Sequence, residues 1–489
     1  MMFDAARPAP ALPLANLDLD QLRAQDRPFE EAEAALVRSI VALPRWLPEQ
    51  DEHGLRYALN LARLGRLREP GGRELDLSGP LAAFRAELGA VAEPLLLGPG
   101  GVNQVGVVRA APRITARALE ERARLLAGPA AGVPPEALDR ELCEKALVLV
   151  AGGGGGVSYV FLGGFALLEQ YGLVPRLLAG ASMGSILLLF RARRPRFDPE
   201  EVAAVVDGLS FRSLFRFLDV ESRYSLPGTM RLYLRSGIGE FMKGADGAPL
   251  TLGELPIPLL VAVTGIRAGA LPHDPSYYEH LLDLHGRVPR PSVLKRLASD
   301  LVGSLSELVR QRDRFTRLYL GADEDTRGFD AVDAVGFSSS LPGIIHYDIV
   351  REDERMHRLL GELFRRHDLF RLMDGGIADN VPARAAFQAV HEGRLGTRNA
   401  FVLAFDGFGP KLSQPLWFSV EQLVAQNVAR NRPFIHHHRS FQQTLSPVEL
   451  VPSVSRVRRA IQWGKEELLP DMPFVSRMVR PFPPPRAAG

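Results

Sequence analysis

A run of five consecutive glycines, Gly152–Gly156, constrains this chain more than any other feature of its sequence. The apolar segment Ala146–Ala151 precedes the run. The whole stretch 146–168 carries no charge over a length that could cross a bilayer. Five adjacent glycines nevertheless disfavour a continuous helix. The stretch therefore predicts a buried strand, a glycine loop and a buried helix.

A second glycine motif, Gly180–Gly184, reads Gly-Ala-Ser-Met-Gly and places Ser182 on a sharp turn. Leu177–Ala179 predict a short strand before the turn, and Ile186–Phe190 predict an apolar helix after it. A serine at such a strand-to-helix turn needs glycines on both sides for steric reasons. The positive end of the helix also helps to hold an alkoxide. Ser182 is thus a candidate nucleophile, although a small-residue turn that packs a helix onto a sheet has the same sequence.

Consecutive glycines at the end of a strand let backbone N–H groups approach a substrate without a Cβ in the way. Such N–H groups stabilise the negative charge that develops on a tetrahedral intermediate. We therefore assign Gly153, Gly154, Gly155 and Gly156 to an oxyanion hole. A nucleotide-binding loop is the rival assignment. Every Gly-x-Gly-x-x-Gly frame fails at its third glycine, however, and no P-loop lysine follows.

From Ala146 the chain alternates between predicted strands and helices. This alternation predicts a mainly parallel sheet covered by helices on both faces. Ligands bind beyond the carboxyl ends of such strands, where both glycine motifs lie.

A third motif, Asp374-Gly375-Gly376, follows a predicted strand at Leu369–Met373. An aspartate there can act as general base for Ser182, and the two glycines permit close approach. Taken alone, the motif is more typical of a turn or a helix cap. Its place after the two glycine motifs favours the catalytic interpretation.

The glycine run, the Gly-x-Ser-x-Gly motif and the distant Asp-Gly-Gly, in this order, resemble the patatin-like phospholipases. Two further blocks are similar to family blocks, Ser338–Gly343 (Ser-Ser-Ser-Leu-Pro-Gly) and Asp374–Pro382. The resemblance covers about Lys145–Gly464. It implies a three-layer α/β/α fold with a mainly parallel central sheet, and a catalytic dyad of Ser182 and Asp374.

The resemblance also implies a serine lipid acyl hydrolase of phospholipase A type that needs no metal and no organic cofactor. Asp374 would accept the Ser182 proton, Ser182 would attack a carboxylic ester of a phospholipid or another acyl lipid, and water would hydrolyse the acyl-enzyme. The family's loop usually reads Gly-Gly-Gly-x-Arg-Gly. Aligned on Gly153–Gly155, this chain has Val157 at the arginine position and Ser158 at the last glycine.

Two other hypotheses remain. A Ser–acid–His triad needs a histidine after Asp374, where only His391 and His436–His438 are available. We expect His391 late in a helix that begins at Asn380, a poor position for a base. A catalytically weak or inactive lipid-binding or regulatory protein of the same fold is motivated by Val157, but an intact dyad argues against it.

Composition limits the partners. The 59 Lys and Arg nearly balance the 57 Asp and Glu, so no nucleic-acid partner is implied. Cys143, the only cysteine, excludes an internal disulfide and a cysteine-based metal cluster. No ligand-spaced partner accompanies His436–His438, so we expect a solvated loop or helix end there. The start of the chain lacks the features of a secretory signal. We therefore expect a cytoplasmic protein that contacts a membrane only peripherally.

We expect three regions along the chain. Residues 1–144 are a helical N-terminal region whose Pro/Ala-rich start, about 1–16, is disordered or loosely packed. Residues 145–464 are the catalytic domain, and 465–489 are a Pro-rich C-terminal tail.

Three segments of the catalytic domain carry separate expectations. Residues 199–242 predict helices rich in Phe and Arg, for which we favour a core-facing amphipathic role over a membrane-touching one. The insertion 267–337, with a helix near 292–318, is either a lid over an apolar groove or a structural excursion. Val448–Val451 predict a late strand.

Overall fold

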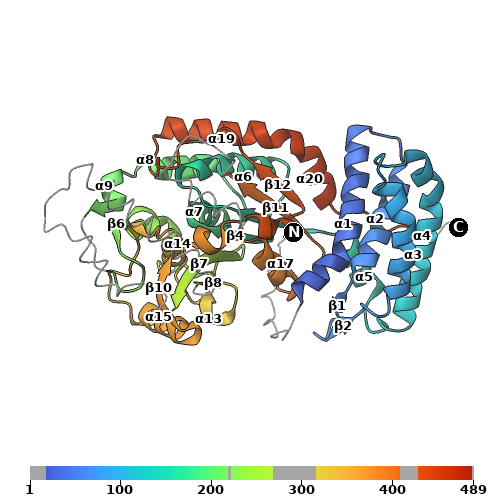
Figure 1. The fold of residues 1–489 in the computed structure, drawn as a ribbon, viewed down its shortest axis with the longest axis horizontal. Helices are drawn as coiled ribbons and strands as arrows, with labels where there is room; N and C mark the ends of the chain where they lie inside the picture. Colours follow the sequence, from blue (N-terminus) through green and yellow to red (C-terminus); the bar gives the residue numbers. More distant parts are fainter. Residues whose placement is uncertain (1–17, 218–221, 268–314, 408–427, 487–489) are drawn as a thin grey trace. The chain divides into compact units, whose positions relative to one another are not determined.

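The computed structural model describes four stretches of the chain (Figure 1), residues 18–217, 222–267, 315–407 and 428–486. The contacts divide the chain into two compact units. Unit 1 comprises residues 1–147, 387–401 and 470–489, and unit 2 comprises residues 148–386 and 402–469. The expected disorder of 1–16 and most of the expected insertion, 268–314, lie outside the described residues.

Unit 1 is mainly helical, as the sequence predicts for the N-terminal region. Its first helix begins after Asp18, whose side chain accepts hydrogen bonds from the N–H groups of Asp20 and Gln21. Leu36 and Leu61 are among the residues fully buried between the helices. The helices are α1 (Leu19–Ala42), α2 (Glu49–Arg63), α3 (Ala82–Leu96), α4 (Gln104–Ala127), α5 (Pro135–Cys143) and α20 (Met472–Val479).

A small antiparallel hairpin, β1 (Arg66–Arg68) and β2 (Glu74–Asp76), interrupts the helices of unit 1. The sequence predicts a break at Pro70-Gly71 but not the two strands. Strands of three residues are too short to show an alternating pattern.

The buried carboxylate of Glu33, on α1, lies close to three basic side chains inside unit 1. Its Oε1 atom lies 3.0 Å from Arg56 Nε and 2.7 Å from Lys145 Nζ, and its Oε2 atom lies 3.8 Å from Arg63 Nη1. Burial alone would raise the pKa of Glu33, but Lys145, Arg56 and Arg63 together hold it well below its usual value. The carboxylate is therefore ionised at neutral pH and offsets the buried positive charge.

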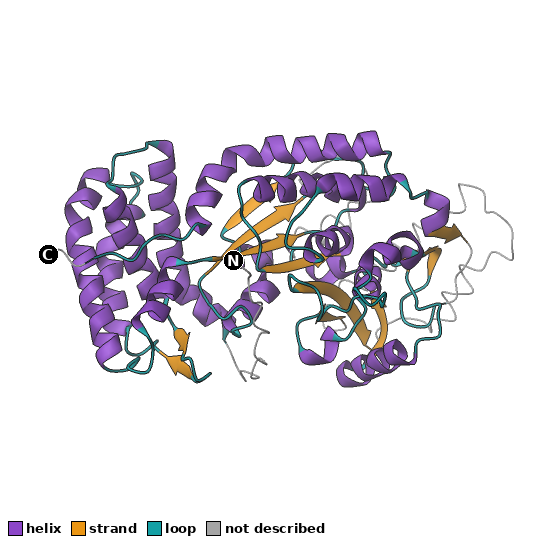
Figure 2. Cartoon of the chain, turned by 180° about the vertical axis from the view of Figure 1, so that it is seen from behind, coloured by secondary structure: helices purple, strands orange, loops and turns teal. Residues whose placement is uncertain are grey.

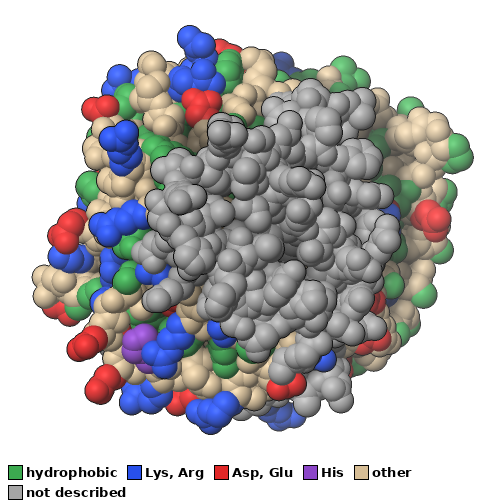
Figure 3. Space-filling model, turned by 60° about the vertical axis from the view of Figure 1, so that its left-hand side comes forward, with side chains coloured by type: hydrophobic (Ala, Val, Ile, Leu, Met, Phe, Trp, Pro, Cys, Tyr) green, Lys and Arg blue, Asp and Glu red, His purple; other side chains and the backbone are tan. Residues whose placement is uncertain are grey.

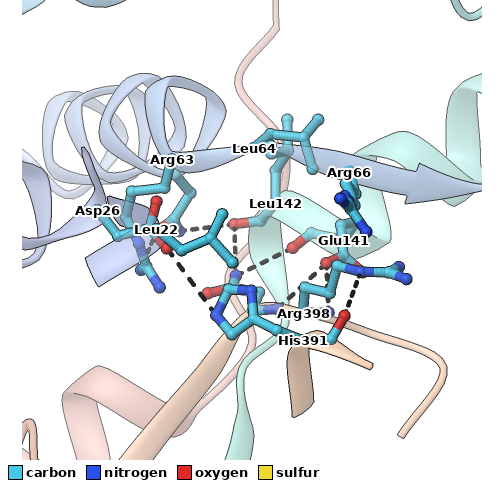
Figure 4. Close-up of a pocket in the computed structure, with 12 residues that line it drawn as sticks. Leu22, Asp26, Arg63, Leu64, Arg66, Glu141, Leu142, His391 and Arg398 are labelled. Atoms are coloured by element: carbon cyan, nitrogen blue, oxygen red, sulfur yellow. Dashed lines mark hydrogen bonds and ion pairs between the residues drawn. The ribbon is translucent and has the colours of Figure 1, made fainter. Parts of the chain in front are cut away.

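A polar cavity of about 30 Å³ also lies within unit 1, beside the segment 387–401 (Figure 4). In it, His391 Nε2 lies 3.9 Å from Asp26 Oδ2. Burial raises the pKa of Asp26 to about 7 and lowers that of His391 to about 3, so both side chains are neutral in mildly acidic solution. Glu141 accepts a hydrogen bond from the Arg398 N–H at 2.8 Å. A cavity of this volume is large enough for about one water molecule.

The core of unit 2 is a seven-stranded sheet (Figure 2) in the order β10-β7-β4-β3-β11-β12, with β8 also paired to β7. The pairs β3–β4, β4–β7 and β11–β12 are parallel, so the sheet is mainly parallel as predicted. The strands are β3 (Ala146–Ala151), β4 (Leu177–Ala181), β7 (Leu259–Arg267), β8 (Phe315–Leu320), β10 (Leu369–Met373), β11 (Ala400–Asp406) and β12 (His437–Ser440).

Helices cover this sheet and complete the predicted three-layer fold (Figures 1 and 2). The helix α6 (Phe161–Gln170) packs against α19 (Val454–Leu468), and α14 (Ala331–Ser338) packs against α7 (Ser182–Ala192) and β7. Every residue of β3 and β4 is buried. Burial on both faces explains why these strands are continuous apolar runs without alternation.

Strand β7 pairs with two strands that run toward each other along one of its edges. The parallel strand β4 ends with Ala181 opposite Ala262, and the antiparallel strand β10 ends with Met373 opposite Thr264. Strand β8 pairs along the other edge. Residues on a strand rise by about 3.3 Å each. The residues that follow β4 and β10 are therefore brought close together.

The structure corrects the helical prediction for residues 199–242. This segment contains α8 (Pro199–Asp207), α9 (Phe211–Leu214) and α10 (Leu234–Ile238), but also two strands. Strands β5 (Phe215–Phe217) and β6 (Gly228–Leu232) form a three-stranded sheet with β9 (Gly343–His346). Since β9 lies far along the chain, local periodicity could not show this pairing.

Four smaller predictions also differ from the structure. Residues 315–318 begin the strand β8 instead of ending a helix, because they pair with β7. Residues 448–451 form no strand, and His437–Ser440 form the edge strand β12 instead of a loop or helix end. The segment 465–489, expected as a tail, includes the end of α19 and all of α20. Among the helices of the described residues, none has both the length and the apolar character needed to cross a membrane.

Replacing Glu33 by Gln should destabilise the protein by about 3–5 kcal/mol, because three buried cations lose their carboxylate. Urea unfolding of the full chain measures this loss. The matched control is Glu31→Gln on the same helix, since Glu31 is half exposed and pairs with Arg27. That change should cost less than about 1 kcal/mol. Equal losses would show that the buried network does not stabilise unit 1.

Candidate active site

Ser182 occupies a strained turn between β4 and α7. Its φ is +50°, in the left-handed region that non-glycine residues rarely adopt. A Cβ on Gly180 would lie 2.8 Å from Leu188 Cδ1, and a Cβ on Gly184 would lie 2.3 Å from the Gly152 carbonyl oxygen. Both glycines therefore allow α7 to pack closely on the ends of the strands, and the turn has the geometry of a nucleophile elbow.

The Ser182 hydroxyl donates a hydrogen bond to Asp374 Oδ2 at 2.6 Å. Asp374 follows β10 and caps α16 (Gly375–Asp379), where its Oδ1 accepts the Gly376 N–H at 2.8 Å. Burial raises the pKa of Asp374 to about 6, although the hydrogen bonds from Ser182 and Gly376 oppose this rise. Above about pH 6 the carboxylate is ionised and can accept the serine proton.

The two glycines of the Asp-Gly-Gly motif allow this approach. A Cβ on Gly375 would lie 2.0 Å from the carbonyl oxygen of Ala262 on β7. A Cβ on Gly376 would lie 2.7 Å from Asn380 Oδ1 and 3.0 Å from Asp374 Oδ1. A side chain at position 375 would displace α16 from β7, and one at position 376 would displace the side chain of Asp374 or Asn380.

Two hydroxyl groups that sequence reasoning missed fix the backbone of the pair to β7. Ser338 Oγ accepts the Ser182 N–H at 2.8 Å and donates to the Ala262 carbonyl at 2.6 Å. Thr264 Oγ1 donates to the Asp374 carbonyl at 2.8 Å. Ser338 lies in the Ser-Ser-Ser-Leu-Pro-Gly block, which was a signal. The only signal for Thr264 is a polar residue in an apolar strand.

The glycine loop lies beside this pair, but its four predicted donors are not equivalent. The Gly153 N–H donates to Asn380 Oδ1 at 2.9 Å, and the Gly156 N–H donates to the Pro447 carbonyl at 3.1 Å. Within the described residues, the N–H groups of Gly154 and Gly155 have no hydrogen-bond partner. The N–H groups of Gly154 and Gly155 are thus free to donate to a substrate, and the oxyanion hole remains a prediction.

Both remaining donors have backbone angles that favour glycine, with φ of 151° at Gly154 and 56° at Gly155. Asn380 follows α16, and the helix expected to begin at Asn380 begins at Ala383 as α17 (Ala383–His391). The Asn380 side chain joins the Asp-Gly-Gly motif to the loop through Gly153. Val157 is buried and fills the space beside Gly407, where an added Cβ would meet its Cγ1 at 2.1 Å. The residue at the usual arginine position therefore packs away from Ser182.

A large apolar cavity of about 450 Å³ adjoins the pair. Ser182, Asp374 and the loop glycines Gly153–Gly155 form part of its wall. The volume is in the range of small-molecule sites. The remaining wall is mainly aliphatic and aromatic, and includes Phe190, Val205, Leu214, Phe215, Leu232 and Ile238. The cavity suits a long apolar group whose reactive end lies at Ser182.

Histidine takes no part in this site as far as the chain is described. No histidine lines the cavity, and His391 lies beside Asp26 in unit 1. Among the described residues, no group of three His, Cys, Asp or Glu side chains could hold a metal ion. The geometry is that of a serine paired directly with an aspartate.

Ser182 is hydrogen-bonded to Asp374 beside an apolar cavity in a mainly parallel three-layer fold, and a serine paired with a base in this way is chemically able to act as a nucleophile. Residues 149–387 match the family model described as Patatin-like phospholipase, which supports assigning this part of the chain to that family. The match supports lipid acyl hydrolysis as the general activity of this part of the chain. A search of curated protein sequences finds no significant match.

Replacing Ser338 by Ala should lower kcat for an ester substrate roughly 10- to 100-fold with little change in KM, because Ser182 loses the contact that fixes its position. Steady-state kinetics with a short-chain p-nitrophenyl ester measure both constants. Ser340→Ala is the matched control, since Ser340 is equally buried and, among the residues that the structure describes, its hydroxyl bonds only to the Gly336 carbonyl. If both variants kept the wild-type kcat, Ser338 would not position the nucleophile.

Proposed function

We propose that the protein is a serine lipid acyl hydrolase of phospholipase A type that cleaves carboxylic esters of phospholipids. One observation carries the proposal. Ser182 Oγ lies 2.6 Å from Asp374 Oδ2 in the wall of an apolar cavity of about 450 Å³. The family match supports lipid acyl hydrolysis in general, and the dyad and the phospholipid substrate are our inference.

In the first half-reaction, Asp374 accepts the Ser182 proton while Ser182 Oγ attacks the ester carbonyl carbon. The carbonyl oxygen becomes negatively charged in the tetrahedral intermediate. The free N–H groups of Gly154 and Gly155, together with the positive end of α7, stabilise that charge. The intermediate collapses to an acyl-enzyme, and the departing alcohol takes the proton from Asp374.

In the second half-reaction, water replaces the alcohol. Asp374 accepts a proton from the water as its oxygen attacks the acyl carbon. The second tetrahedral intermediate uses the same two N–H donors. Its collapse breaks the Ser182–acyl bond, releases a fatty acid and returns the proton to Ser182, so one water is consumed per ester.

The cavity supports a long acyl chain as the substrate group. Each methylene that leaves water for an apolar environment contributes about 0.8 kcal/mol. The cavity wall offers few polar groups apart from those near Ser182 and Asp374. Affinity should therefore rise with chain length until the cavity is filled.

The rival hypothesis, a weak or inactive lipid-binding protein, rested on Val157 at the usual arginine position. Val157 packs beside Gly407 and is not part of the cavity wall. No observed contact therefore connects this departure with loss of the dyad, and the catalytic proposal is favoured.

Ser182→Ala and Asp374→Asn should each lower kcat roughly 10⁴-fold or more, because the nucleophile or its base is lost. Hydrolysis of a short-chain p-nitrophenyl ester and of phosphatidylcholine in mixed micelles provides the measurement. Unchanged melting temperatures would show that the variants fold. Asp379→Asn is the matched control, since Asp379 is a buried aspartate of the same motif that bonds to Tyr319 and Asn431.

Two outcomes would contradict this proposal. Near-wild-type turnover by Asp374→Asn would mean that another group is the base. Absence of turnover by the wild-type protein on both substrates would favour the non-catalytic lipid-binding hypothesis.

The pH profile follows from the raised pKa of Asp374, which is about 6. Below that pH the carboxyl group is protonated and cannot accept the serine proton. We expect kcat/KM to be constant above about pH 7 and to fall about tenfold per unit below pH 6. In Asp374→Glu, any residual activity should show a displaced acid limb. A limb that stayed in place would belong to a different group.

A further inference from the structure

Three phenylalanine rings form a row from the cavity wall to the surface of unit 2. The ring centroids of Phe211 and Phe215 are 4.8 Å apart, and those of Phe211 and Phe217 are 6.1 Å apart. Exposure increases along the row, from 6% at Phe215 through 38% at Phe211 to 58% at Phe217. Exposed aromatic rings in contact with one another are typical of a surface that meets an apolar partner.

This row is continuous with the cavity that holds Ser182. Phe215 and Phe211 both line the cavity, whereas Phe217 does not. Phe211 thus faces both the cavity and solvent. All three side chains of the row are apolar, so an apolar chain could move along them from the surface toward the cavity.

Two arginines accompany the exposed rings. Arg212 and Arg216 are both exposed, and neither forms an ion pair with a carboxylate of the described residues. The Arg216 guanidinium lies 4.3 Å from the ring centroid of Tyr233. Figure 3 shows this side of unit 2, where Lys and Arg side chains are interspersed with Asp and Glu at the margin of the view. The positive charge here is available to an anionic partner.

We propose that Phe211, Arg212, Arg216 and Phe217, the aromatic–arginine patch, dock the protein on an anionic lipid surface. Phenylalanine rings insert at the boundary between headgroups and acyl chains, and arginines pair with lipid phosphates. Docking in this way places the cavity wall at Phe211 against the lipid layer. This proposal rests on the proposed function, since the patch would give a lipid acyl chain a route to Ser182.

The test measures binding of the full-length Ser182→Ala protein to vesicles, so that no lipid is consumed. Phosphatidylcholine vesicles are compared with vesicles that also contain phosphatidylserine, by co-sedimentation. Adding Phe217→Ser should lower binding to the mixed vesicles about tenfold. Adding Arg212→Gln and Arg216→Gln should lower it about tenfold or more, and should weaken its dependence on salt.

Matched controls come from exposed residues outside the patch. Phe241→Ser removes a ring of similar exposure, 42%. Arg109→Gln with Arg113→Gln removes the same net charge from exposed positions of α4. These controls should bind the mixed vesicles as tightly as the parent protein. Binding by the patch variants equal to that of the controls would overturn the proposal.

A second measurement separates this proposal from the proposed function. In the Ser182-containing protein, the patch variants should hydrolyse a soluble short-chain ester at the wild-type rate but lose turnover on vesicles. If the wild-type protein hydrolysed the soluble ester but the Ser182→Ala parent did not bind vesicles, the patch proposal would be wrong and the hydrolase proposal would stand. If the Ser182→Ala parent bound vesicles but the wild-type protein hydrolysed no ester, the hydrolase proposal would be wrong and the patch proposal would stand. Loss of vesicle turnover with undiminished vesicle binding would also overturn the patch, and would indicate a different partner for it.

Discussion

The site depends on the pairing of one strand with two opposed neighbours. Strand β4 and strand β10 approach each other along one edge of β7 and end opposite Ala262 and Thr264. Hydrogen bonds from Ser338 to Ala262 and from Thr264 to Asp374 then fix the residues that follow both strands to β7. Since register in a sheet changes only in whole residues, the separation of Ser182 and Asp374 is set by backbone pairing, and the side chains need only complete it.

The parts of the site that the sequence predicts are those where a side chain is sterically forbidden. Gly180, Gly184 and Gly375 each lie where a Cβ would meet a neighbouring atom, and the motifs show the need for glycine even though the fold alone shows which atoms are met. Asn380 and Thr264 are different. Their contacts depend on which strands and loops meet in three dimensions, which no local pattern encodes. The same reason explains the missed pairing of β6 with β9.

The glycine loop shows how a family motif can change without change at the serine. In this chain the loop is held at one end by Asn380 and at the other by Pro447, which leaves Gly154 and Gly155 between two anchored residues. Val157 contributes to a separate contact with Gly407. The loop glycines are therefore constrained by backbone geometry, whereas Val157 is constrained by the volume that it fills.

The pairing of β7 with β8 has a consequence for the length of the chain. Ile266 pairs with Phe315, so the ends of the segment between them are held about one strand spacing, roughly 4.8 Å, apart. The entropic cost of closing such a segment grows only with the logarithm of its length. Residues can thus be gained or lost there while the register of β7 is retained. The number of residues between Ser182 and Asp374 can therefore vary, because strand pairing, and not chain length, sets the distance between them.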